Sequence, residues 1–187
     1  VVRFNGGAQA AHNVQPRLGV HHTFSQFGSG TFAGVPTLLS QHMLVEPIAL
    51  ATEARELAAL GVADPLALLR VDGRALITTP IHVAANRARE RARGDGQHGS
   101  CGKGIGETAW FALEHPQVAP TVADCARPNE LAEKLAAMAG LYGELLADQP
   151  VPDIGALIGM YADFAAAVRI VDGEALAAFA ARGRLVF

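Results

Sequence analysis

The residues best suited to bind an anion lie in one run, 98–108 (HGSCGKGIGET). Four glycines fall within eight residues of it, and glycine lets the backbone adopt positive φ and approach a ligand closely. Ser100 and Cys101 add small polar groups, and Lys103 adds a cation. A helix-like segment follows, and the free N–H groups at a helix start favour an anion. The run therefore predicts a loop that binds a phosphate or a nucleotide.

Two common phosphate-binding motifs do not match this loop. A Walker A loop needs Ser or Thr directly after its lysine, whereas Gly104 follows Lys103. The dinucleotide-binding fingerprint needs a β-branched strand before its glycines, and no such run precedes residue 98. An ordinary flexible surface turn therefore stays open as an alternative interpretation of the run.

A second polar stretch follows the first predicted strand. Residues 1–7 read as a short strand followed by two glycines. Gln9, His12 and Asn13 then place polar side chains after the strand end, where α/β folds commonly position their sites. The alternative is a turn or helix cap in which His12 makes only a local hydrogen bond.

The intervening pattern predicts the elements that hold these two stretches. Residues 38–45 and 67–71 read as strands, and residues 21–35 read as a loop with a β-ribbon. Apolar residues at helical spacing, with Pro or Gly near several boundaries, predict the helices. These helices cover residues 47–60, 81–93, 107–114, 129–146, 153–168 and 173–181.

Four arginines alternate between Arg87 and Arg93, in the helix that leads into the glycine-rich run. Residues two apart on a helix do not share a face. We therefore expect a solvated surface here, with a contribution to the anion site as the subsidiary interpretation.

Length and composition bound the class of protein. The 187 residues are half hydrophobic, which predicts one domain, or one domain with a subdomain, around a substantial core. A net charge of −3 gives no reason to expect nucleic acid as a partner. We expect no membrane segment, because no apolar run of about 18 residues occurs. Cys101 and Cys125 fit neither a disulfide framework nor a metal-binding spacing, so a cytoplasmic location is expected.

Residues 1–12 (VVRFNGGAQAAH) and 98–106 (HGSCGKGIG) are similar to two segments of adenylosuccinate synthetases, V-V-R-[YF]-x-G-G-x-N-A-G-H and I-G-T-T-G-R-G-I-G. The sequence between these two segments also resembles the family, with its motifs in the same order. Residues 45–50 resemble V-x-[SD]-P-x-x-L, and residues 82–90 resemble H-x-A-x-D-x-A-R-E. The resemblance covers nearly all of this chain but less than half of a family chain.

The resemblance implies an α/β fold, with part of a P-loop-GTPase-like central sheet and a largely helical subdomain. It divides the chain into a strand and loop part, 1–46, a mostly helical part, 47–183, and a returning strand, 184–187. The implied activity is GTP-dependent ligation of L-aspartate to IMP in AMP synthesis, with magnesium, in a cytoplasmic homodimer. We expect the chain to be the middle segment of a longer protein.

The resemblance also implies roles for individual residues. His12 falls on the catalytic histidine, which donates a proton as the γ-phosphoryl group moves to the O6 atom of IMP. The backbone carbonyl of Ala11 falls on a magnesium ligand. The positions implied to bind the IMP-like nucleotide are Gln9, Ala10, Ala11, His12, Cys101 and His115.

Several positions depart from the family pattern. Gln9 replaces Asn, Ala11 replaces Gly, and Cys101 replaces Thr, although a thiol is a much weaker hydrogen-bond partner than a hydroxyl. In ungapped register, His115 replaces an arginine that reaches the IMP phosphate of the partner subunit. The sequence also lacks the family's G-D-E-G-K-G loop, which holds the catalytic Asp and a Lys, and its E-G-A-Q-G, guanine and aspartate segments.

We therefore expect catalysis to need residues outside this chain. Two alternatives stay open at this point. One is the same ligase chemistry on a different purine nucleotide, and the other is a non-catalytic nucleotide-binding remnant.

Overall fold

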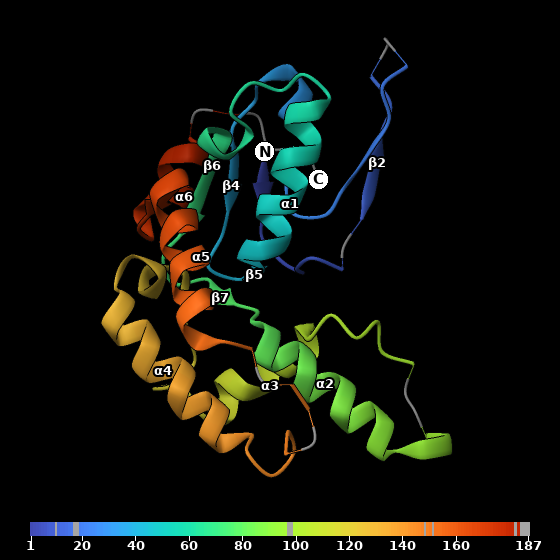
Figure 1. Cartoon of the computed structure of the whole chain (residues 1–187). Coiled ribbons are helices and arrows are strands. Elements are labelled where there is room, and N and C mark those ends of the chain that lie inside the picture. The colour runs from blue at the N-terminus through green and yellow to red at the C-terminus, as the bar shows by residue number, and fades with distance from the viewer. Residues whose placement is uncertain are drawn as a thin grey trace.

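A computed structural model describes residues 1–9, 11–16, 19–96, 99–147, 149–150, 152–181 and 183. A parallel sheet of four strands, in the order β1-β4-β6-β8, forms the centre of the upper half of Figure 1. Because parallel strands end at the same edge, the loops after β1 and β4 lie at one edge of this sheet. The strands are β1 (Val2–Arg3), β4 (Thr37–Leu39), β6 (Leu69–Asp72) and β8 (Arg169–Val171).

Two smaller sheets flank this centre. Strands β2 (His12–Val14) and β3 (His22–Phe24) pair as an antiparallel hairpin, seen at the upper right of Figure 1. Strands β5 (Leu44–Val45) and β7 (Leu76–Ile77) pair in parallel where the chain passes into the lower half.

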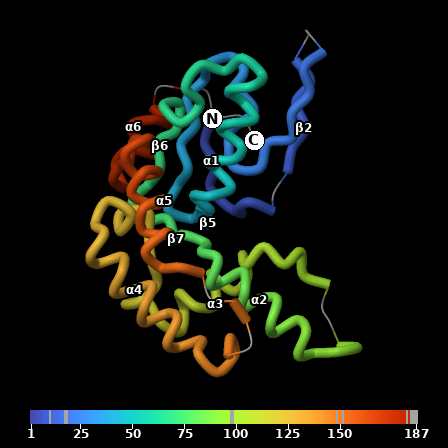
Figure 2. The backbone as a smooth tube through the Cα atoms, viewed as in Figure 1, coloured from blue at the N-terminus to red at the C-terminus, as the bar shows by residue number. Residues whose placement is uncertain are grey.

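The helices divide between the two halves of the molecule. We call α2, α3 and α4 the helical part, and the four-stranded sheet with α1 the sheet part; α1 packs against α5. Figure 2 shows the chain entering the helical part through β7 and returning through α5. The helices are α1 (Pro47–Ala59), α2 (Pro80–Ala92), α3 (Ile105–Glu114), α4 (Pro128–Leu141), α5 (Ile154–Ala167) and α6 (Glu174–Ala180). Short 3-10 helices cover Thr31–Ala33, Pro65–Leu68, Gly94–Gly96 and Val122–Ala126.

Helix α1 shows how the local sequence sets these boundaries. Pro47 occupies its first turn, and the Glu46 carboxylate accepts hydrogen bonds from the backbone N–H groups of Ile48 and Ala49. Gly61 follows the helix with φ +94°, a conformation that favours glycine. Leu50 and Leu57 are fully buried on its inner face. The predicted helix of residues 47–60 is therefore confirmed.

One cluster of buried side chains runs through both parts. Leu39 and Val71 contribute from the sheet, Phe111 and Leu135 from the helical part, and Tyr161 from α5. Within the described ranges, no helix has the length and hydropathy needed to cross a membrane. The predicted α/β class, with a parallel central sheet beside a largely helical region, is confirmed.

Several predicted boundaries were wrong. The single strand expected over 38–45 is two strands in different sheets, because the Met43 N–H donates to the Ser40 carbonyl and turns the chain. The helix expected over 129–146 ends at Leu141, near Gly140 and Gly143, which are poor helix formers. The strand expected from residue 67 begins at Leu69, since a 3-10 turn comes first.

Other elements were not predicted or cannot be compared. Strands β7 and β8 have no counterpart among the expected elements. The predicted final strand, 184–187, lies outside the described residues.

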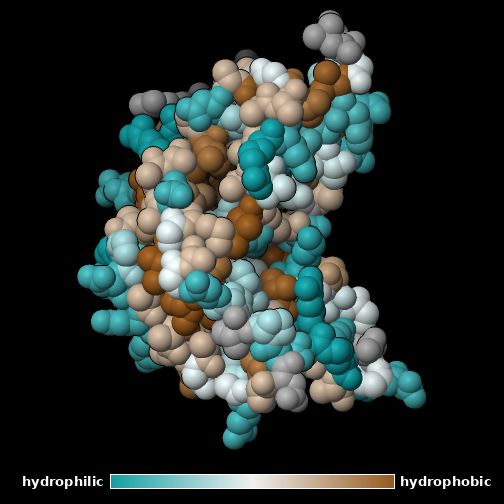
Figure 3. All heavy atoms as spheres, viewed as in Figure 1, coloured by the Kyte–Doolittle hydropathy of each residue, from teal (hydrophilic) through white to brown (hydrophobic). Residues whose placement is uncertain are grey.

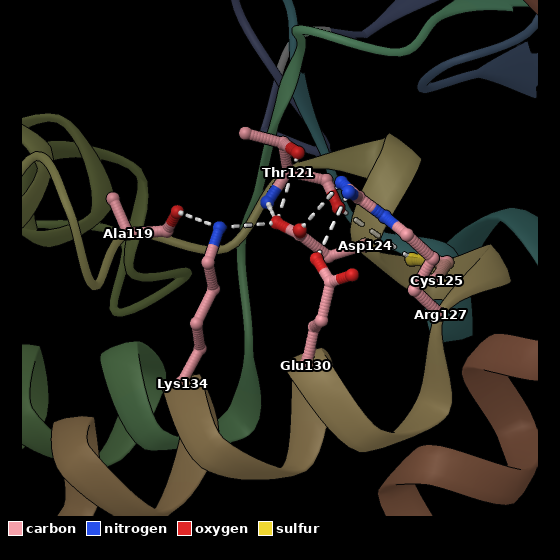
Figure 4. Close-up of polar contacts among 7 residues, drawn as sticks. All are labelled: Ala119, Thr121, Asp124, Cys125, Arg127, Glu130 and Lys134. Atoms are coloured by element: carbon pink, nitrogen blue, oxygen red, sulfur yellow. Dashed lines mark hydrogen bonds and ion pairs between the residues drawn. The ribbon is translucent and has the colours of Figure 1, made fainter.

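A buried carboxylate, Asp124, joins the segment after α3 to α4 (Figure 4). Its side chain is 1 % exposed and accepts hydrogen bonds from the Thr121 backbone and hydroxyl, the Arg127 guanidinium and the Lys134 ammonium. Burial acts to raise the pKa of Asp124, but the bonds from Lys134 and Thr121 outweigh it and hold the pKa below its usual value. Both oxygens of the Asp124 carboxylate accept hydrogen bonds, which indicates a structural role.

Candidate functional site

The two predicted stretches meet in the structure. Gly7 is buried against the first residue of α3, and a Cβ added there would lie 2.6 Å from Ile105 Cδ1 and 2.8 Å from the Leu44 carbonyl oxygen. The Leu44 N–H donates to the Gly6 carbonyl at 2.9 Å, which ties the same loop to β5. The loop after β1 and the glycine-rich run are therefore neighbours, although they are far apart in sequence.

Gly104 is the residue of the glycine-rich run that directly precedes helix α3. It is the N-cap of α3, has φ +76°, and lies so close to α2 that a Cβ would come within 2.9 Å of the Val83 nitrogen. The Thr108 hydroxyl donates to the Gly104 carbonyl at 2.8 Å and lies 3.0 Å from the Thr78 hydroxyl. The helix was expected to begin after Gly106, but it begins earlier, at Ile105.

Replacing Gly104 by alanine is expected to lower the free energy of unfolding by roughly 2 kcal/mol. The left-handed conformation alone costs roughly 1–2 kcal/mol for a residue with a Cβ, and the backbone of α2 blocks the added atom. The matched control is Gly106→Ala. Gly106 lies inside α3 with open space around it, so alanine there is expected to stabilise by up to about 1 kcal/mol. Urea unfolding of both variants checks the opposite signs, and equal midpoints would contradict this account.

His12 lies in strand β2, not in the loop that the sequence predicted. Its half-buried imidazole stacks on Phe24, with ring centroids 5.4 Å apart and planes 16° apart. Burial lowers the pKa of His12, and the positive charge of Arg3 lowers it further. The imidazole is therefore mainly neutral near pH 7, a form that still carries one N–H donor.

The other predicted residues of this first stretch are exposed. Gln9 and Ala11 both face solvent. Ala10 lies outside the described residues, as does His98 at the start of the second stretch. Among the predicted side chains of residues 9–12 that the structure describes, His12 alone is half-buried.

Lys103 is electrostatically coupled to Glu46, at the start of α1. Burial raises the pKa of Glu46, the N-cap of that helix, while the two capping N–H bonds and then the Lys103 ammonium act to lower it. This coupling places Lys103 within electrostatic range of Glu46. The exposed cation and the exposed thiol of Cys101 therefore belong to a loop that borders the sheet part.

Helix α2 holds the other side of the glycine-rich run. The Arg87 guanidinium donates to the Gly102 carbonyl at 3.2 Å, and the Ser100 N–H donates to the Glu90 carboxylate at 2.9 Å. The remaining arginines of the cluster point to separate partners, as their spacing predicts. A cavity of about 430 Å³ opens beside the loop, lined by Asn86, Arg89, Arg93, Ser100, Gly106, Glu107 and Trp110.

Glu107 is a buried carboxylate that the sequence did not single out. It accepts hydrogen bonds from Arg89 at 3.0 Å and from the Tyr142 hydroxyl at 2.8 Å. The Arg89 guanidinium also lies 4.5 Å from the centre of the Trp110 ring. Glu107 therefore fixes one wall of the cavity. Its place directly after Gly106 was the signal available in the sequence.

His115 is not brought to the loop. It follows the last residue of α3, and its ring lies 5.0 Å from that of Phe111. A helix of ten residues is about 15 Å long, which separates His115 from Gly104 within one chain.

The surface between the β2–β3 hairpin and the helical part is visibly hollowed at the right of Figure 3.

A magnesium site is not formed by the described residues alone. Mg²⁺ takes oxygen ligands in octahedral geometry and usually keeps several waters. Within the described part of the chain, no three or more His, Cys, Asp or Glu side chains gather where they would hold a metal. The Ala11 carbonyl, expected from the family resemblance to be a ligand, stays a prediction, and such an ion would need further oxygens.

Comparison with known proteins identifies the family. A profile of the adenylosuccinate synthetase family matches residues 1–183. The chain belongs to this family. It is 33 % identical over 144 residues to the adenylosuccinate synthetase of Neisseria gonorrhoeae, covering 76 % of this chain and 32 % of that protein. It is 31 % identical over 147 residues to the Mycobacterium leprae adenylosuccinate synthetase, covering 78 % of this chain and 33 % of that protein.

The fold agrees with this assignment. The structure of fully ligated adenylosuccinate synthetase from Plasmodium falciparum matches with a TM-score of 0.80 and 17 % identity, over 95 % of this chain and 41 % of that chain. The chain spans about a third of the length of the curated relatives that it matches.

Proposed function

We propose that this chain contributes the nucleotide-binding part of an adenylosuccinate synthetase, which joins L-aspartate to IMP and converts GTP to GDP and phosphate. The observation that carries the proposal is the packing of the loop around Gly7 against Ile105, in a chain that belongs to this family. This contact supports a single site to which the His12 stretch and the glycine-rich run both contribute. In such a site the His12 stretch would bind the base of IMP, and the glycine-rich run would bind its phosphate.

In this proposal the neutral His12 imidazole donates its N–H toward the IMP O6 atom and stabilises the charge that develops during phosphoryl transfer. Gln9, Ala10, Ala11 and the exposed Cys101 border the nucleotide. Lys103 adds positive charge where its phosphate approaches the start of α3. The Ala11 carbonyl would be one ligand of a magnesium ion, which would neutralise charge on the phosphates of GTP when bound.

The remaining functional expectations extend this proposal. His115 contacts the nucleotide of a second copy, since its own loop lies at the other end of α3. The protein acts as a homodimer in the cytoplasm, and no nucleic acid or membrane takes part. The catalytic Asp and Lys of the phosphoryl-transfer loop come from outside this chain.

The test is a ligation assay with the complete protein that carries this chain. IMP, GTP, L-aspartate and Mg²⁺ are expected to give adenylosuccinate, with no product when GTP or aspartate is omitted. Parallel reactions replace IMP by GMP or by deoxy nucleotides. A clear preference for one of those nucleotides would identify it as the substrate instead of IMP. Nucleotide binding without turnover would favour a non-catalytic role.

A further inference from the structure

The imidazole of His12 stacks on an aromatic ring of the facing strand. His12 and Phe24 are directly opposite each other in the β2–β3 ladder, and their rings stack. Within the part of the chain that the structure describes, no hydrogen bond reaches the His12 ring. A three-residue strand fixes the Cβ of His12 but leaves its side-chain torsions free, so the stacked ring is what selects the rotamer.

Phe24 is itself held rigidly. It has no exposed surface, and the rings of His22 and Phe32 meet it edge-on, with centroids 4.7 Å and 5.5 Å away. Edge-to-face arrangements of this kind are favourable beyond the area that they bury. Phe24 therefore offers His12 a fixed surface, whereas an aliphatic side chain would offer no preferred plane.

Helix α1 anchors the strand that carries Phe24. The Glu53 carboxylate, 5 % exposed, accepts the backbone N–H groups of Ser25 at 2.8 Å and Gln26 at 2.9 Å. The buried Gln26 amide in turn bonds both backbone groups of Glu46, at 2.8 Å and 3.0 Å. These bonds join the His12 hairpin to helix α1 and to its N-cap residue, Glu46.

We propose that Phe24 is a positioning residue for His12: its ring holds the imidazole plane so that the nitrogen edge faces the bound nucleotide. This proposal rests on the proposed function, because it assigns Phe24 to the same reaction. Among the described residues, Arg3 on β1 is electrostatically coupled to His12, His22 on β3 contacts Phe24, and Glu53 on α1 lies 3.8 Å from the His22 ring nitrogen. Arg3 is fixed by hydrogen bonds to the Ser25 and Phe27 carbonyls.

The test compares Phe24→Leu with Phe24→Tyr and with Phe32→Leu in the complete protein. Phe32 belongs to the same aromatic cluster and contacts Phe24 and His22, so Phe32→Leu is the matched control for lost packing. We expect Phe24→Leu to lower kcat about tenfold with KM within about twofold, since small misplacements of a catalytic group are costly. Phe24→Tyr is expected to retain kcat, and Phe32→Leu, which leaves the Phe24 ring opposite His12, to lower kcat less than Phe24→Leu does.

NMR of the histidine ring protons provides a readout that does not need turnover. In Phe24→Leu we expect the His12 signals to lose the ring-current shift caused by Phe24, and the pKa of His12 to rise toward its ordinary value. Both properties should persist in Phe24→Tyr and in Phe32→Leu. A parent protein without ligase activity would overturn the proposed function. If His12 is stacked in the parent protein but Phe24→Leu leaves kcat unchanged, only the positioning role would be overturned. Equal losses of kcat in Phe24→Leu and Phe32→Leu would also overturn it, as would loss of kcat in a Phe24→Tyr variant whose His12 signals keep the ring-current shift.

Discussion

Replacement of His12 by alanine is expected to lower kcat for aspartate ligation by about 10²–10³-fold, the usual contribution of one positioned hydrogen-bond donor that stabilises transition-state charge. Alanine removes the imidazole nitrogens of the ring that stacks on Phe24 and puts no donor in their place. The KM for IMP should change less, because the backbone of the loop around Gly7 and the glycine-rich run are untouched. Steady-state kinetics of the complete protein measure both quantities.

The fold is expected to survive this change. His12 is only half-buried, and loss of its stacked pair with Phe24 costs about 1 kcal/mol. His21→Ala is the matched control, because His21 is an exposed histidine next to β3 with no described contact to Phe24. It should leave both kcat and the urea midpoint unchanged. Near-normal turnover of the His12 variant would remove His12 from the catalytic machinery.

The sequence predicted the longer helices because their ends carry strong local signals. Pro47 and Gly61 frame α1, and Thr79 caps α2 by accepting the N–H of His82. Strands β7 and β8 were not predicted because they contain only two and three residues. Such runs are too short to show an alternation of apolar and polar side chains. Their pairing depends on neighbouring strands that lie far away in the sequence.

The candidate site was predicted less completely than the helices. Both loops were visible as separate stretches, but the contact of Gly7 with Ile105 is a tertiary one that no local pattern encodes. The stacking of His12 on Phe24 follows from the register of a hairpin, which the sequence did not specify. Asp124 did leave a signal, since Thr121 and Asp124 have the spacing of a capping box, and the structure forms that box.

Substitution of Asp124 by asparagine is expected to lower the free energy of unfolding by roughly 3 kcal/mol, the low end of the range for breaking a buried ion pair. The low end applies because the side chains of Lys134 and Arg127 are 25 % and 50 % exposed and stay partly hydrated. An asparagine side chain fits the same space, but its NH₂ group must then face one of the donors that the carboxylate accepted. For a chain of this size the melting temperature should fall by roughly 6–12 °C.

The pH dependence and a matched control identify charge as the cause of that loss. The pKa of Asp124 is lowered in the folded protein, so its contribution is complete above the ordinary value of 3.8 and is lost as the pH falls below it toward the folded pKa. The difference between parent and Asp124→Asn in urea midpoint should therefore be large at pH 7 and shrink below pH 3.8. Glu130→Gln removes a neighbouring pair to Arg127 whose partners are about half exposed, so it should cost less than about 1 kcal/mol. A difference between parent and Asp124→Asn that persists unchanged in acid would assign the loss to packing instead of charge.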